Sequence, residues 1–66
     1  MTKKLKSLKT GEFFTLKDIP EPNGHQVFVK ENYDRSEKKF WCMRWDDISD
    51  GRYLSGDKDV YVDFIF

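Results

Sequence analysis

Cysteine and histidine, which carry nucleophilic and metal chemistry, occur once each in this chain, as Cys42 and His25. A thiol next to an imidazole can act as a nucleophile, and a fold could bring these two side chains together. Cys42, however, lies in an aromatic run, Phe40 to Trp45, where a cysteine is far more often inert packing material. One His and one Cys also fall short of the four ligands of a zinc site. We therefore expect no catalysis, no metal and no other cofactor.

The acidic residues near the C-terminus match a calcium-binding loop at only a few positions. Asp46, Asp50, Gly51 and Asp57 fall on its first, fifth, sixth and twelfth positions. The third position is Ile48, the twelfth is Asp instead of a bidentate Glu, and no helices flank the segment. We expect two turn-forming clusters around a short strand, and no calcium site.

Aromatic side chains beside lysines suggest a third chemistry, which is stacking on unpaired bases. The chain contains 6 Phe, 3 Tyr and 2 Trp, a high share for so polar a sequence. On a β-surface such rings bind single-stranded nucleic acid while basic neighbours contact phosphate. The residues that we expect to do this are Phe28, Trp41 and Tyr61 for stacking, and Lys30, Lys38 and Lys39 for phosphate.

Two other interpretations of the same residues stay open. Trp and Tyr also anchor protein interfaces, so the surface would equally suit a protein partner or a second copy of the chain. In a domain this small, most of the rings could simply form the core. The 12 basic residues are balanced by 12 acidic ones, whereas dedicated nucleic-acid binders usually carry a basic excess.

Alternating apolar residues and closely spaced turns predict strands that would position these side chains. The expected strands are 12–17, 26–33, 39–45, 51–54 and 60–66, with a Pro-containing loop at 18–24 and a turn or 3₁₀ turn at 46–50. This pattern predicts an all-β fold, a small five-stranded antiparallel barrel or strongly curved sheet, SH3-like or OB-like. A three-stranded sheet with a terminal helix is the alternative, although no segment after Leu8 has a helical period.

The polar segment Asp34 to Lys39 predicts a hairpin loop in which Asp and Ser bond the local backbone. A slip of one residue in this hairpin would exchange its two faces. Pairing of Tyr33 with Phe40 would direct inward Val27, Val29, Tyr33, Phe40 and Cys42, and outward Phe28, Lys30, Trp41 and Met43. The slipped pairing would bury Trp41, Met43 and Trp45 instead, and a bulge could turn Trp45 inward in either case. We favour the first register, because it buries the cysteine.

Length and charge divide the 66 residues into a basic N-terminal arm, 1–10, and one small domain, 11–66. The arm carries Lys3, Lys4, Lys6 and Lys9, with Leu5 and Leu8 as anchors toward the first strand, while six aspartates follow from Asp46 onward. The arm could touch anionic surfaces, or it could be a solvated terminus attracted to the acidic end of its own domain.

A single cysteine excludes an intrachain disulfide and fits the cytoplasm. No apolar run of about 20 residues indicates a membrane span, and no hydrophobic region follows the lysines as in a signal peptide.

Three segments together resemble short accessory proteins of Gram-positive mobile elements, such as prophages and conjugative elements. They are Leu8 to Leu16, Tyr33 to Cys42 and Asp57 to Val62, so the resemblance spans most of the chain. It implies a bacterial cytoplasmic protein carried with DNA-handling genes, which favours nucleic-acid binding over other functions. It assigns no biochemical activity and no functional residue.

Overall fold

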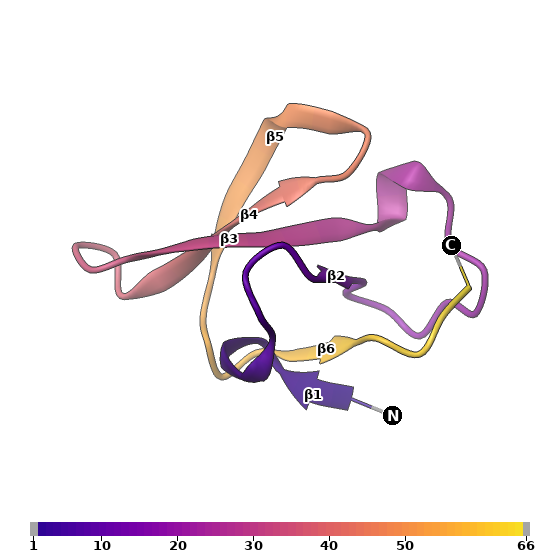
Figure 1. Ribbon diagram of the computed structural model, residues 1–66, viewed down its shortest axis with the longest axis horizontal. Coiled ribbons are helices and arrows are strands. Elements are labelled where there is room, and N and C mark those ends of the chain that lie inside the picture. The colour runs from indigo at the N-terminus through magenta and orange to yellow at the C-terminus, as the bar shows by residue number, and fades with distance from the viewer. Residues whose placement is uncertain (1, 66) are drawn as a thin grey trace.

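The chain folds mostly into β-strands. The computed structural model describes residues 2–65, without the side chain of Ile48. The elements, shown in Figure 1, are β1 (Thr2–Lys4), η1 (Leu5–Ser7), β2 (Phe13–Phe14), η2 (Gly24–Gln26), β3 (Phe28–Asp34), β4 (Lys39–Arg44), β5 (Asp47–Leu54) and β6 (Asp59–Tyr61), where η1 and η2 are single 3₁₀ turns. Within residues 2–65 no α-helix occurs. The all-β class is therefore confirmed, and the alternative with a terminal helix is wrong.

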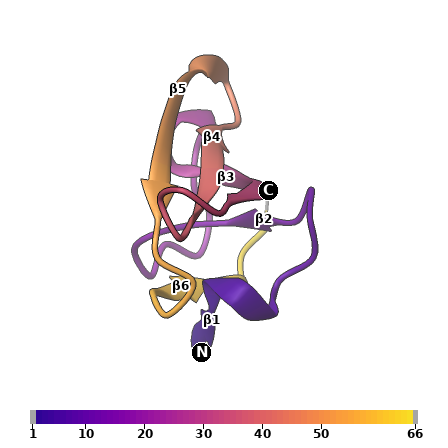
Figure 2. The same ribbon diagram turned by 90° about the vertical axis from the view of Figure 1, so that its left-hand side faces the viewer.

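The strands form two antiparallel sheets that meet at one point. The larger sheet has the order β2-β3-β4-β5, and the smaller pairs β1 with β6. Thr15 and Tyr61 exchange backbone hydrogen bonds of 2.9 and 3.0 Å, which join β6 to the end of β2. In Figures 1 and 2 the β1-β6 pair lies below the larger sheet. The described strands are thus two joined sheets and do not close into a barrel.

The hydrophobic core lies where one face of the larger sheet meets η1 and β6. Its buried members are Leu5, Leu8, Phe14, Phe28, Cys42 and Val60, with Leu16, Phe40, Leu54 and Val62 packed around them. We call the sheet face that carries Phe14, Phe28 and Cys42 the inner face. Since strands alternate their side chains between two faces, the opposite face of the same sheet contributes nothing to this cluster.

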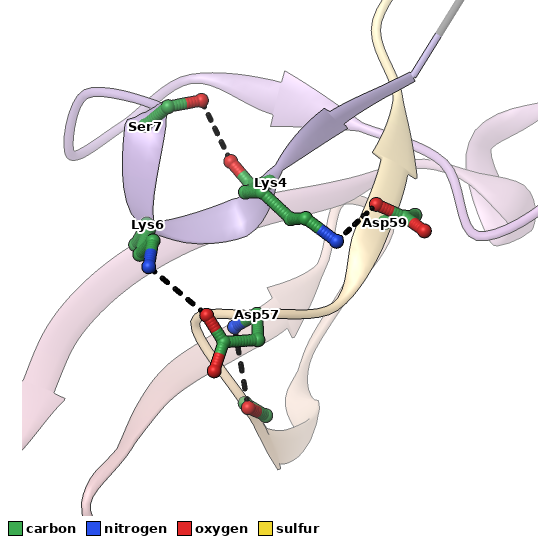
Figure 3. A network of polar contacts seen from close by, with 6 residues as sticks. Lys4, Lys6, Ser7, Asp57 and Asp59 are labelled. Atoms are coloured by element: carbon green, nitrogen blue, oxygen red, sulfur yellow. Dashed lines mark hydrogen bonds and ion pairs between the residues drawn. The ribbon is translucent and has the colours of Figure 1, made fainter.

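The first ten residues, expected to be a basic arm outside the domain, contribute to this core, because Leu5 and Leu8 are buried in it. The Leu5 amide donates to the Lys58 carbonyl at 3.0 Å. Ion pairs join Lys4 to Asp59 at 2.8 Å and Lys6 to Asp57 at 3.0 Å (Figure 3). These two pairs join the segment to the acidic end of the chain, which was one of the two alternatives considered for it. Met1 lies outside the described residues.

The central hairpin forms at the predicted place. Tyr33 pairs with Phe40, as in the favoured register, and residues 35–38 form the loop. The Asp34 carboxylate accepts backbone hydrogen bonds from Ser36 and Glu37 at 2.8 and 3.2 Å, and Lys38 takes the left-handed conformation with φ 57°. A short acidic side chain at the start of the loop therefore satisfies the backbone amides that the turn frees.

A β-bulge just before this hairpin end overturns the predicted facing of β3. Tyr33 pairs with Phe40, but Lys30 pairs with Cys42, so β3 holds one extra residue between the two pairs. The extra residue places Phe28 and Lys30 on the same face as Cys42. They are 5% and 4% exposed, and the prediction that they face outward is wrong. Trp41 and Met43, on the other face of β4, do face outward.

The remaining boundaries differ from the predicted strands mainly at the ends of the sheet. β2 is shorter than 12–17, and β6 is shorter than 60–66, whose last residue lies outside the described part. β5 includes most of the predicted 46–50 turn, because the β4–β5 connection is the two-residue turn Trp45-Asp46. Trp45 is 48% exposed, so no bulge turns it inward.

Candidate functional site

The side of the larger sheet that faces away from the core carries a row of apolar side chains, which we call the outer face. It consists of Val29 on β3, Trp41 and Met43 on β4, and Tyr53 on β5, with Phe13 of β2 at its edge. The strand register brings them together, since Val29 pairs with Met43 and Trp41 pairs with Tyr53. Tyr53 is 40% exposed, and Val29, Trp41 and Met43 are half-buried. An apolar row of this kind on a sheet surface is typical of an interaction site.

Trp41 is held against the sheet by the residues opposite it. Its ring meets the Tyr53 ring edge to face, with centroids 4.9 Å apart. Beside Tyr53 stands Gly51, where an added Cβ would lie 2.1 Å from Trp41 Cζ2. A glycine is therefore required for the indole to lie over β5. Because its rotamer is fixed by packing, Trp41 would lose little entropy on binding a partner.

Tyr53 is fixed at its other end by the hairpin loop. Its hydroxyl donates to Asp34 Oδ2 at 3.1 Å. The Glu37 amide, together with the Tyr53 hydroxyl and the Ser36 amide, lowers the pKa of Asp34. The same hydrogen bond to the Asp34 carboxylate raises the pKa of Tyr53, so the phenol stays protonated at neutral pH. The two rings of the outer face are therefore ordered before any partner arrives.

The outer face carries little charge. Among the residues that the strand register pairs on this face, the ionisable pair is Asp34 and Lys39, opposite each other at the hairpin end. They are of opposite sign, so this pair adds no net charge to the face. A cationic platform for phosphate, as the sequence predicted, would need lysines among the rings.

Lys30, one of the predicted phosphate contacts, is a core residue. Its Nζ donates to the Leu8 carbonyl and lies 4.2 Å from the centroid of the Phe40 ring. Burial lowers the pKa of Lys30, against smaller opposing effects of Cys42 and Glu12. Phe28, a predicted stacking residue, packs on Phe14 with ring centroids 5.9 Å apart. Neither side chain is accessible to a macromolecular partner.

The other predicted residues lie in separate places. Trp41 is on the outer face and Lys39 at its hairpin end, whereas Lys38 belongs to the exposed loop. Tyr61 is half-buried on β6, in the smaller sheet. The structure therefore does not assemble the six residues into one surface. The sequence analysis did not identify Tyr53 as a site residue. Its pairing with Trp41 depends on a register shift between Met43 and Arg44, which no local sequence pattern predicts.

The residues with catalytic or metal-binding potential also lie apart. Burial raises the pKa of the Cys42 thiol to about 11, so the thiolate is scarce at neutral pH. His25 is on η2, where its Nδ1 lies 2.7 Å from Asp46 Oδ2. Across the described residues, no three His, Cys, Asp or Glu side chains are grouped so as to hold a metal ion. Cys42 therefore serves as core packing, and His25 makes a surface contact with the Asp46 carboxylate.

Comparison with protein-family models, with curated proteins and with solved structures finds no match to this chain. In the part of the chain that the structure describes, no helix has the length and apolar character needed to cross a membrane.

Proposed function

We propose that this protein is a non-catalytic interaction module that pairs with a second copy of itself through the outer face. The observation that carries the proposal is the packed pair of Trp41 and Tyr53 beside Met43 and Val29, outside the core cluster and partly open to solvent. Ordered aromatic residues at the centre of an apolar patch are the usual anchors of protein interfaces. A two-fold contact would bury these rings in both copies at once.

Charge favours a second copy as the occupant. A two-fold interface brings the same patch into contact with itself, so any net charge on the patch would repel its equivalent. Among the cross-strand pairs of the outer face, the one acidic and the one basic residue, Asp34 and Lys39, face each other. The whole chain is also neutral, with 12 basic and 12 acidic residues, so long-range repulsion between copies is small.

Binding of single-stranded nucleic acid is the alternative, and it would use the same rings. Trp41 and Tyr53 on an antiparallel sheet offer π-faces to bases. Of the lysines expected to assist, Lys30 is buried, Lys38 is in the hairpin loop, and Lys39 lies on the outer face opposite Asp34. The alternative thus has one of its three expected cations on the outer face, and cations give such sites most of their affinity.

We also propose that the two sheets are an open form of the small-barrel architecture, SH3-like or OB-like. The support is the backbone bridge between Thr15 and Tyr61, which continues the hydrogen bonding from one sheet to the other. We further propose that the protein is cytoplasmic, because the buried, free Cys42 fits a reducing compartment. We also propose that it originates among the accessory proteins of mobile elements.

Sedimentation velocity over a range of about 10 µM to 1 mM protein tests whether a second copy binds the outer face, since this range brackets weak self-association. We expect the sedimentation coefficient to rise with concentration and to change little with salt, because the contact is apolar. Trp41→Ser should keep the protein monomeric. Trp45→Ser is the matched control, since it removes an equal ring from the β4–β5 turn instead of the outer face.

A monomer at every concentration would contradict the proposal. Titration of the same samples with oligothymidine at low salt tests the alternative, which is binding of single-stranded nucleic acid. A salt-sensitive quenching of tryptophan fluorescence that is lost in Trp41→Ser would establish nucleic-acid binding in place of self-association.

A further inference from the structure

A small pocket opens at one end of the inner face, on the opposite side of the sheet from the proposed dimer contact. It has a volume of about 270 Å³. Its wall is built from the segment after β2, from η2 and from one residue each of β3, β4 and β5. The lining residues are Leu16, Lys17, Ile19, His25, Gln26, Phe28, Arg44 and Arg52. The lining includes three permanent cations and no carboxylate.

Two arginines meet over one ring in this pocket. Arg44 on β4 is directly opposite Phe28 on β3, and Arg52 on β5 is opposite Cys42, so the sheet places both arginines on the inner face. Their guanidinium carbons lie 5.7 and 5.1 Å from the centroid of the Phe28 ring. The ring in turn packs on Phe14. Phe28 is therefore a fixed ring against which both guanidinium groups pack.

The positive charge of the pocket is only partly compensated. Asp50 Oδ2 lies 3.0 Å from Arg44 Nε, yet this buried nitrogen has no hydrogen-bond partner of acceptable geometry among the described residues. Arg52 forms no ion pair within residues 2–65. The Asp46 carboxylate is bound to His25. Asp18, next to Lys17, is exposed and outside the lining.

We propose that this pocket binds a small organic anion, with Arg44 and Arg52 on its phosphate or carboxylate group. Guanidinium groups offer paired donors that match either anion, and such charge-assisted hydrogen bonds are the strong ones. Leu16, Ile19 and Phe28 provide an apolar wall for the rest of the ligand. The volume suits a ligand the size of an aryl phosphate or an aryl carboxylate, below the usual range for larger ligands.

The test follows the Nε–Hε signals of the arginines in ¹⁵N spectra at constant ionic strength. The probes are inorganic phosphate, phenyl phosphate and benzoate, added to wild-type protein and to Trp41→Ser, which separates this site from self-association. We expect the Arg44 and Arg52 signals to shift and to saturate with a Kd of about 1 mM or below for phenyl phosphate or benzoate. The probe that binds tighter identifies the anionic group.

Two substitutions and a matched control sharpen the result. Arg52→Gln should weaken binding about tenfold, in line with loss of one charged hydrogen-bonding group. Arg52→Lys, which keeps the charge but loses the planar fork, should lie between Arg52→Gln and wild type. Arg35→Gln, in the exposed hairpin loop, removes the same group elsewhere and should leave the Kd unchanged. Shifts that never saturate, or that include Arg35 equally, would mean ionic screening only and would overturn the proposal.

Discussion

Lys30 shows at the scale of a single residue how burial changes a role that composition suggests. A lysine between valine and glutamate in a strand is ordinarily a surface cation. Here its stem lies in the core and its ammonium group is bound by the Leu8 carbonyl and the Phe40 ring. Both partners are distant in sequence, so only the folded chain reveals them. The lysine joins the first ten residues to the central hairpin.

The lowered pKa of Lys30 predicts a pH dependence of stability. Well below its folded-state pKa, the folded and unfolded chains bind the same proton at this site. Between that pKa and the ordinary value of 10.5, the unfolded chain binds more protons, so the free energy of unfolding rises with pH. Urea unfolding between pH 7 and pH 10.5 should show wild type gaining stability relative to Lys30→Met, which has no charge to bury. A difference between the two that stays constant over this range would contradict the burial of the ammonium group.

The strands show at the scale of elements what local patterns could and could not predict. Alternation and turn residues correctly predicted β3, β4 and the hairpin loop between them, because these depend on neighbours in sequence. Val29, predicted to face inward, lies on the outer face, because a bulge of one residue exchanges the faces and carries no signature in Glu31 and Asn32. Val27, just before β3, is buried as predicted. In β5, the shift next to Arg44 brings Gly51 beside the Trp41 ring, a contact that neighbours in sequence do not reveal.

Deletion of Asn32 tests the bulge directly. Removing one of the two residues between Lys30 and Tyr33 would make the register with β4 regular, and every observed pair would be kept. We expect the variant to fold, with a loss of free energy of unfolding of about 1–2 kcal/mol from the changed twist. Thermal unfolding followed by circular dichroism measures the loss, and slow reaction of Cys42 with a thiol reagent reports an intact core.

Deletion of Val29 is the control, because it lies before the bulge and would force Phe28 or Lys30 out of the inner face. We expect this variant to be unfolded. If deletion of Asn32 lowered the free energy of unfolding as much as deletion of Val29, the extra residue of the bulge would be needed for the fold, contrary to our expectation.

The chain as a whole depends on its first ten residues. Composition predicted a charged arm, and the lysines are exposed as expected, but the two leucines between them complete the core beneath the larger sheet. The two leucines were expected only as anchors toward the first strand, because a spacing of three residues does not predict that they complete the core of the domain. In so small a domain, each buried leucine is a large part of the total stability.

Removal of residues 2–8 should therefore unfold the protein, since loss of a single buried leucine side chain costs about 2–5 kcal/mol and two are lost here. The double substitution Lys4→Gln with Lys6→Gln keeps the leucines and breaks the ion pairs of Figure 3. It should change the melting temperature little, because both pairs are exposed to solvent. A folded truncated protein would show that the segment is a dispensable arm after all.

Concentration-dependent ¹⁵N spectra would show whether the outer face is the surface by which two copies meet. We predict that amide shifts between about 20 µM and 1 mM protein concentrate at Val29, Trp41, Met43 and Tyr53, and that Trp41→Ser abolishes them. Spectra that do not change with concentration would contradict the account. So would changes confined to β1, β6 or the hairpin loop, because they would place the contact on another surface.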